Sequence, residues 1–242
     1  MTTDERLLQM FGDAEGTENN KRILALIDDL GKAVFPMSDY ATLVAALADT
    51  TKKISYLTAD TTLTGMLAFS RAFRFYGQDF SLTDATLDEN QYMAAQISHE
   101  DVIIQDVEFH ISGATTSPQN TIYAIDVGAA NSRIEGCTFV MANSGDAGSV
   151  SVYYEGYAGH ILKDNTMSNG VAVTGGAVLD EVSGNTFAAT KGFGLGECTI
   201  GGLHYFEADP IKLAAIKAYL IAEGNVTTGE ATGLVVEGYF EA

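Results

Sequence analysis

The feature that most constrains this chain is a six-residue phrase that is repeated between residues 101 and 187. Each copy starts with an aliphatic residue, continues through a Gly or Asp suited to a turn, and ends with a large apolar residue. The copies occupy residues 104–109, 134–139, 162–167 and 182–187, so their starts are 30, 28 and 20 residues apart. This recurrence is typical of a solenoid, in which each coil buries its apolar edge only against the coils above and below.

The spacing inside the phrase predicts a bend. Five residues separate the aliphatic end from the large apolar end, which fits neither the period of one strand nor that of one helix. Two short strands joined by a bend would turn both ends inward. The residues expected at the bend are Gly136, Gly184, Asp106 and Asp164.

The position after the bend predicts a polar stack inside the solenoid. It holds Val107, Cys137, Asn165 and Asn185 in successive copies. Two consecutive Asn residues could form a hydrogen-bonded ladder, and Cys137 is expected to be a small buried thiol. The two cysteines of the chain, Cys137 and Cys198, are too few for a disulfide framework.

These phrases, among them Ser183-Gly-Asn-Thr-Phe187, resemble the coils of the pectate-lyase-like superfamily. The resemblance covers residues 54–206 and implies an all-β solenoid, a right-handed single-stranded parallel β-helix with N-terminal α-helices and one C-terminal helix. Proteins of this kind commonly begin with a small amphipathic helix that plugs the open end, and residues 40–65 resemble such an entry.

Several helices are expected before the solenoid. Thr2 and Glu5 form a capping-box pattern for a helix over residues 2–11. A second helix is expected over residues 18–35, and Ser38 is expected to cap a third over 39–48. The second helix carries a narrow apolar stripe that needs a partner. The stripe consists of Ile23, Ile27, Leu30 and Val34.

The domain organisation follows from these elements. Residues 1–37 are expected to be a helical docking and oligomerisation segment, 38–206 the β-helix with its plug at 39–48, and 207–242 a C-terminal helix and β tail. An earlier coil is expected at 75–80, projecting loops at 112–120 and 143–148, and a glycine-rich turn at 192–196. Asp209 and Pro210 predict the start of a helix over 211–222, which the β tail follows over 225–240.

Composition restricts the partners. The chain has 13 basic and 32 acidic residues and a formal charge of −19. This charge argues against nucleic acid or an anionic membrane as a partner. We find no apolar run long enough for a transmembrane helix and no secretory signal pattern at the start.

Chemistry-bearing residues are scattered along the sequence. The strongest enzymatic hypothesis is cleavage of a polysaccharide along one face of the stack, because carboxylates roughly 5 to 10 Å apart suit acid and base roles. The candidates are Asp106, Glu108, Asp126, Asp164, Asp180 and Glu181. Acidic residues occur on every coil, however, so no catalytic, cofactor or metal site is assigned. The histidines His99, His110, His160 and His204 form no metal-binding pattern.

The organisation favours a non-catalytic function. Helical N-terminal modules followed by a short β-helix resemble bacteriophage tail spikes, tail fibres and head-decoration proteins. We therefore expect a structural or receptor-facing virion protein that forms a homotrimer, docks to other virion or capsid proteins through its N-terminal helices and has polysaccharide as a further candidate partner. The alternative is a polysaccharide-degrading hydrolase or lyase. An ice-binding solenoid would need regular Thr-x-Thr ranks, which the repeats lack.

Overall fold

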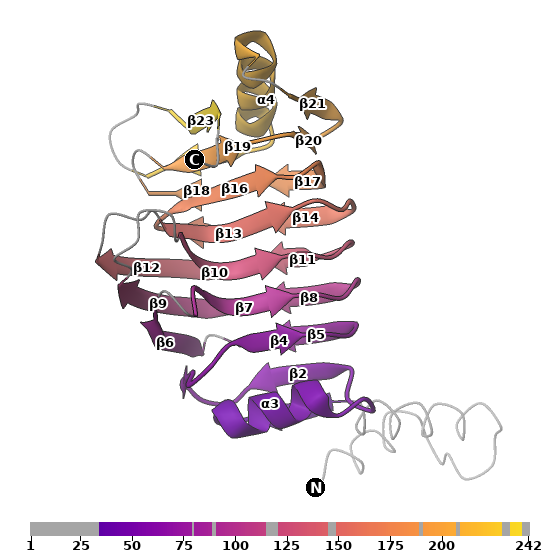
Figure 1. The fold of residues 1–242 in the computed structure, drawn as a ribbon, viewed down its shortest axis with the longest axis vertical. Coiled ribbons are helices and arrows are strands. Elements are labelled where there is room, and N and C mark those ends of the chain that lie inside the picture. Colours follow the sequence, from indigo (N-terminus) through magenta and orange to yellow (C-terminus); the bar gives the residue numbers. More distant parts are fainter. Residues whose placement is uncertain are drawn as a thin grey trace, which may run out of the picture.

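The computed structural model is a stack of parallel β-coils with three faces (Figure 1). It describes residues 34–78, 80–88, 91–114, 121–144, 149–188, 191–206, 209–228 and 233–238. Successive coils contribute one strand to each of three sheets, here named A, B and C. Every strand pair in the described residues is parallel except the last pair of sheet A, β20 with β21. The chain is therefore mostly β and has the architecture of a β-solenoid.

Sheet A contains the first strand of each coil. In spatial order its strands are β1 (Val34–Met37), β2 (Ile54–Leu57), β5 (Phe73–Tyr76), β8 (Val102–Gln105), β11 (Arg133–Glu135), β14 (His160–Lys163), β17 (Ala177–Ser183), β20 (Cys198–Ile200) and β21 (Leu203–Tyr205).

Sheets B and C contain seven strands each. Those of sheet B are β3 (Thr61–Thr62), β6 (Ser81–Leu87), β9 (Glu108–Ala114), β12 (Thr138–Ser144), β15 (Thr166–Met167), β18 (Thr186–Phe187) and β22 (Val226–Thr227). Those of sheet C are β4 (Leu67–Phe69), β7 (Met93–Ile97), β10 (Ile122–Val127), β13 (Ser149–Glu155), β16 (Gly170–Thr174), β19 (Gly192–Leu195) and β23 (Val235–Gly238).

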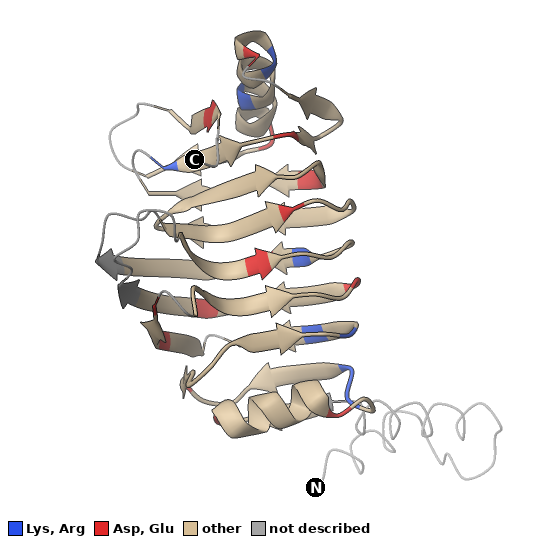
Figure 2. Cartoon of the chain, in the orientation of Figure 1, with Lys and Arg blue, Asp and Glu red and all other residues tan. Residues whose placement is uncertain are grey.

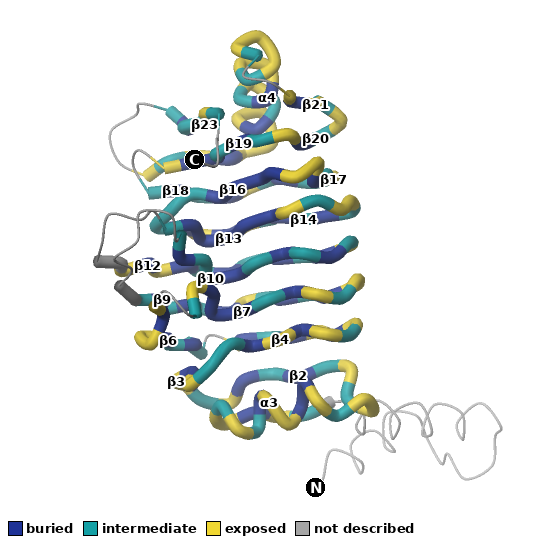
Figure 3. The backbone as a smooth tube through the Cα atoms, viewed as in Figure 1, coloured by how far each residue is buried: buried dark blue, intermediate teal, exposed yellow. Residues whose placement is uncertain are grey.

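The strand register confirms the repeated phrase. Ile134 pairs with Ile104 and Leu162, and Leu162 pairs with Val182, so the four aliphatic starts form one column in sheet A. The large apolar ends form a second column in sheet B. Its members are Phe109, Phe139, Met167 and Phe187. All eight side chains are buried, and Figure 3 shows buried residues in every coil.

The bends have the expected backbone. Asp106, Gly136, Asp164 and Gly184 all have φ between 54° and 65°. A Cβ on Gly136 would lie 2.3 Å from Oδ1 of Asp106, and one on Gly184 would lie 2.1 Å from Oδ1 of Asp164. From coil to coil, the bend residue thus alternates between Asp and Gly. The carboxylate of each Asp fills the space that a side chain on the Gly of the next coil would need.

The predicted Asn ladder exists and is longer than expected. Asn165 donates from Nδ2 to Oδ1 of Asn185 at 2.9 Å, and Asn185 donates in the same way to Oδ1 of Asn225 at 2.8 Å. The second contact of each Nδ2 is a backbone carbonyl, such as that of Leu162 for Asn185. At the lower end the backbone N–H of Cys137 donates to Oδ1 of Asn165. Asn225 was not predicted to join, although Gly224-Asn225 repeats the Gly184-Asn185 pair that precedes it in the ladder.

Two helices lie at the ends of the described stack. The plug helix α3 (Tyr40–Ala48) lies across the first coils, with Asp39 rather than Ser38 as its N-cap, because the Asp39 carboxylate accepts from the N–H of Thr42. Arg71 holds the other end of α3 by donating to the carbonyls of Ala46, Leu47 and Lys52. Helix α4 (Pro210–Ala222) has Asp209 as its N-cap and Pro210 in its first turn, as the Asp-Pro pair predicts.

The N-terminal predictions need one correction. Val34 and Phe35 belong to β1, which pairs with β2, so the second predicted helix cannot extend to residue 35 and Val34 is not part of a helical stripe. An exposed strand edge next to β2 is satisfied better by strand pairing than by a helix. The predicted helix over residues 2–11 and the stripe residues Ile23, Ile27 and Leu30 lie outside the described residues.

The first predicted coil is also partly wrong. Phe75 pairs with Ile104 as expected, but Leu82 rather than Phe80 pairs with Phe109. The bend is longer in this coil because Gln78, not Gly77, has positive φ, and a Cβ on Gly77 would collide with the carbonyl of Asp106 at 2.1 Å.

Three predicted irregular segments are strands in part or in full. Residues 112–114 belong to β9 and residues 143–144 to β12, which pair with each other, while the rest of both predicted loops lies outside the described residues. Gly192 and Gly194 lie in β19 and not in a turn. Pairing with both β16 and β23 keeps this glycine-rich strand extended.

Truncation of Phe139 tests the apolar column. Phe139 is 1% exposed and its ring stacks on that of Phe109 at 5.1 Å. We expect Phe139→Ala to lower the free energy of unfolding by about 3 to 5 kcal/mol, as large truncations in packed cores do. The matched control is Val140→Ala, the next residue, whose side chain is 38% exposed. Reversible denaturant unfolding measures both, and a loss below roughly 1 kcal/mol for Phe139→Ala would contradict this packing.

Truncation of Asn185 tests the ladder. Asn185→Ala removes one acceptor for Asn165 and the donor to the carbonyl of Leu162, and leaves each of these buried groups with an unmet hydrogen bond. Each buried unsatisfied group costs about 1 to 3 kcal/mol, so we expect a total loss of roughly 3 kcal/mol or more. The control is Thr186→Ala, one residue further along. Equal losses for the two variants in the same unfolding experiment would mean that the ladder does not stabilise the stack.

Candidate functional site

The outer face of sheet C carries the clearest surface feature of the described residues. One row of outward positions crosses the sheet, because each strand is in register with the next. The row begins with Ala68 of β4 and continues through Gln96, Asp126, Tyr153, Ala172, Gly194 and Glu237. Polar and aromatic side chains therefore occupy the row from Gln96 to Tyr153, and two very small residues separate them from Glu237.

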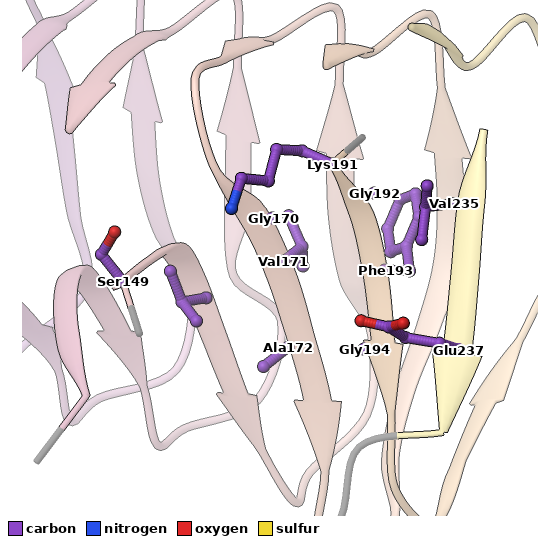
Figure 4. A pocket seen from close by; sticks show the side chains of 11 residues that line it. Ser149, Gly170, Val171, Ala172, Lys191, Gly192, Phe193, Gly194, Val235 and Glu237 are labelled. Atoms are coloured by element: carbon purple, nitrogen blue, oxygen red, sulfur yellow. The ribbon is translucent and has the colours of Figure 1, made fainter. Parts of the chain in front are cut away.

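The small residues form the floor of a furrow with a volume of about 170 Å³ (Figure 4). It lies over β16 and β19 and is bounded by β13 on one side and β23 on the other. In Figure 4, Lys191 extends from one end of the furrow toward Gly170, and Glu237 extends from β23 toward Gly194. The lining residues are Ser149, Val150, Gly170, Val171, Ala172, Lys191, Gly192, Phe193, Gly194, Val235 and Glu237.

The backbone explains two of the glycines. A Cβ on Gly192 would lie 1.9 Å from the carbonyl oxygen of Val235, and one on Gly170 would lie 2.9 Å from that of Gly192. Side chains at these positions would push neighbouring strands apart. The furrow is therefore a direct consequence of close strand approach, and its floor is rigid because it is made of paired backbone.

A cluster of tyrosines lies beside the furrow. The rings of Tyr123 and Tyr153 stack with centroids 4.7 Å apart, and Tyr92 meets Tyr123 edge-on at 6.0 Å. Tyr153 packs with Val150 and Ala172 of the furrow, and its hydroxyl accepts a hydrogen bond from Oγ1 of Thr174 at 3.0 Å. Tyr92 is 39% exposed, so the cluster has an aromatic surface that is open to solvent.

Asp126 is the one predicted carboxylate that belongs to this surface. Its Oδ2 accepts a hydrogen bond from Nε2 of Gln96 at 3.2 Å. Burial raises the pKa of Asp126 above its ordinary value, and the bond from Gln96 opposes part of that rise. The group is thus held in place as a hydrogen-bonding side chain next to the tyrosines.

The structure does not bring the other predicted carboxylates into this site. Asp106 and Asp164 are exposed at the bends between sheets A and B. Glu108 lies in sheet B, with its Oε1 2.8 Å from Nε2 of His110, and Glu181 lies in sheet A next to Lys163 at 3.3 Å. Asp180 is exposed on β17. Among the described residues no group of three or more His, Cys, Asp or Glu side chains is placed to hold a metal ion.

Sequence reasoning missed most of the site. The tyrosines, Lys191 and Glu237 were not singled out, and the glycines of β19 were interpreted as a turn. The available signal was the alignment of strand runs in successive coils, which places Asp126, Tyr153 and Ala172 at matching positions. The phrase at the bends drew attention to sheets A and B, whereas the furrow lies on the third sheet.

Ser132 and His160 form a second chemical pair, inside the stack. Oγ of Ser132 lies 2.9 Å from Nδ1 of His160, and Nε2 of His160 lies 3.3 Å from the carbonyl oxygen of Gly156. Both side chains are fully buried, and the ring of Tyr154 lies 5.0 Å from that of His160. Because no solvent reaches the hydroxyl, the pair holds the turn between sheets C and A and does not present a nucleophile.

The pH dependence of stability tests this interpretation. Burial lowers the pKa of His160 below its ordinary value, so the native state binds fewer protons than the unfolded state between the two pKa values. The contribution of His160 is complete above about pH 6.5 and is lost as the pH falls through the native pKa. We expect the unfolding free energy to fall from pH 7 to pH 5 with a steeper slope in the native protein than in His160→Gln. His204→Gln, which changes an exposed histidine, is the control, and identical slopes in all three proteins would contradict the prediction.

Comparisons with known proteins give no identification. No protein-family model, no curated protein and no solved structure matches this chain. The fold defines the chain as a mostly parallel three-sheet β-solenoid. Its family and its function within this class are proposals. In the described residues, neither helix is long and apolar enough to cross a membrane.

Proposed function

We propose that this protein is a non-catalytic, receptor-facing component of a phage-like particle, and that it binds a glycan on the outer face of sheet C. In this proposal the solenoid is a right-handed β-helix of the pectate-lyase-like kind. Right-handed crossovers are the rule for parallel strands, which supports that hand.

Residues 1–37 are proposed to dock to other virion proteins, and the proposed localisation is the virion. The observation that carries the glycan part is the row from Gln96 to Glu237 with the furrow in its middle.

The chemistry of the row suits a saccharide. A sugar ring has apolar C–H faces and hydroxyl groups around its edge. The flat glycine floor and the exposed tyrosine surface can contact the faces, while Asp126, Gln96 and Glu237 provide acceptors or donors for the hydroxyls. Pockets that bind drug-sized ligands are about 300 to 1,000 Å³, so a furrow of about 170 Å³ suits one ring of a longer chain.

The charge of the surface supports the same partner class. The strands of sheet C contain no Lys or Arg, and acidic residues are spread over the described coils (Figure 2). Lys191, which directly precedes β19, is a single cation beside the furrow. A nucleic-acid backbone would meet repulsion along this face.

The test of glycan binding is a screen of the purified protein against capsular and cell-wall polysaccharides, followed by calorimetry on any ligand found. We expect Tyr92→Ala and Lys191→Ala to weaken binding at least about tenfold, because each removes a direct contact. The matched controls are Tyr76→Ala and Lys163→Ala, which change the same residue types on the outer face of sheet A. Equal effects of the two pairs of variants would remove the furrow as the site.

The enzymatic alternative rests on Asp126, because its raised pKa and its place beside the tyrosines suit a proton donor. Reducing-end and unsaturated-product assays on the same polysaccharides distinguish the two functions. We expect no product from the native protein. Product release that is lost in Asp126→Asn would replace the proposal with a hydrolase or lyase.

The homotrimer is retained as a proposal for the N-terminal segment. Its predicted seam now consists of Ile23, Ile27 and Leu30, because Val34 lies in β1. Light scattering of the full chain and of a chain starting at Val34, which keeps all of β1, tests it. A monomeric mass for the full chain at micromolar concentration would exclude the trimer.

A further inference from the structure

The C-terminal helix α4 is apolar on nearly its whole circumference. Its 13 residues include only two charged side chains, Lys212 and Lys217. Ile216 and Leu220 are buried against the solenoid. A helix that is apolar all round is normally buried all round, so the outer side of α4 indicates a missing contact.

The outer side of α4 is a continuous exposed apolar stripe. Ile211 is 81% exposed and Ile221 is 49% exposed, and three exposed alanines lie between them (Figure 3). The spacing of three and four residues places all of them on one helix face. The stripe consists of Ile211, Ala214, Ala215, Ala218, Ile221 and Ala222.

The end of the stack below the helix also carries exposed apolar side chains. Phe206, which follows β21, is 45% exposed, and Val226 of β22 is 50% exposed. The plug helix α3 lies across the other end of the stack, whereas α4 stands along the long axis (Figure 1). Among the described strands, β22 and β23 each pair on one side only. Apolar side chains and strand edges that need cover thus coincide at this end.

We propose that the stripe on α4 is the contact with a second copy of this chain, packed antiparallel about a two-fold axis. The pattern of the stripe is nearly palindromic, with an isoleucine near each end and alanines between. Antiparallel pairing places Ile211 of one copy at Ile221 of the other, and Ala214 at Ala218. Alanine allows helix axes to approach to the short end of the usual 8 to 10 Å range. A two-fold contact of this kind is self-complementary and closed.

The charge distribution of the chain favours this stripe as the place of contact between two copies. The acidic body of the chain repels other copies, but the stripe has no acidic residue. Self-association is therefore least opposed at this helix.

The size of the stripe sets the strength of the contact. One short helix face and its surroundings bury less than about 1,200 Å², which is the range of weak and transient complexes. We expect the mass measured by light scattering to double as the concentration rises from about 1 to about 100 µM. If the N-terminal segment forms a trimer, the same doubling applies to the trimer.

A charge in the centre of the stripe tests the surface. Ala218→Glu is expected to raise the dissociation constant roughly 30-fold or more, because the buried carboxylate would have no partner. Ala45→Glu makes the same change at an exposed position of α3, at the other end of the stack, and should leave the concentration dependence unchanged. Circular dichroism confirms that both variants are folded. No doubling in the native protein, or the same doubling in Ala218→Glu, overturns the proposal.

Disulfide trapping tests the orientation. The native cysteines, Cys137 and Cys198, are buried and do not compete. A mixture of Ala214→Cys and Ala218→Cys proteins should form the mixed disulfide under mild oxidation faster than either variant forms a disulfide with itself. Preferential self-linking of Ala218→Cys would mean a parallel arrangement and would overturn the two-fold antiparallel contact. Neither experiment depends on glycan binding, so its failure leaves the proposed function untouched.

Discussion

The whole structure depends on vertical register, the requirement that each coil places its inward side chains directly on those of the coil before it. A solenoid coil has no core of its own, because its apolar side chains are covered only by its neighbours in the stack. The Ile104, Ile134, Leu162 and Val182 column in sheet A and the Asn ladder both express this requirement. The ladder is the stricter of the two, because an amide displaced by one residue leaves buried donors and acceptors without partners, whereas an aliphatic column tolerates small shifts.

The inward and outward sides of the same strands obey different constraints. On sheet C the inward residues continue the core. The outward row changes within a few strands from polar Asp126 to aromatic Tyr153 and then to the small residues Ala172 and Gly194. Close backbone approach selects glycine at residues 170 and 192, and this same selection empties the surface above them. The furrow therefore needs no separate explanation from function. The side chains that border the furrow are the part that a function would have to explain. They are a tyrosine cluster on one side and the oppositely charged Lys191 and Glu237 at its margins.

Much of the fold could be predicted from the sequence because the coils repeat a local pattern, and the bends, the ladder and the start of α4 follow from backbone preferences of Gly, Asp, Asn and Pro. The errors arise where tertiary pairing overrides local preference. Val34 and Phe35 follow a helical pattern but complete a sheet edge, and the Gly192 segment has turn composition but is held extended by strands on both sides. The candidate site was missed for a further reason: outward residues of different coils become neighbours only through register, which no single segment of sequence displays.

The contact between the last amide of the ladder and the helix has a consequence for the length of the protein. Asn225 donates from Nδ2 to the carbonyl oxygen of Leu220 at 2.7 Å, as well as to the carbonyl of Val182. The Leu220 carbonyl of the helix thereby occupies the Nδ2 donor of Asn225 that the Oδ1 of a further ladder Asn would otherwise accept from. Helix α4 thus ends the ladder at Asn225 and prevents the addition of another coil there. Duplication of a coil inside the stack would preserve this ending, since every internal amide would still find another above it. The number of coils could therefore change between related proteins without any change to the terminus that closes them.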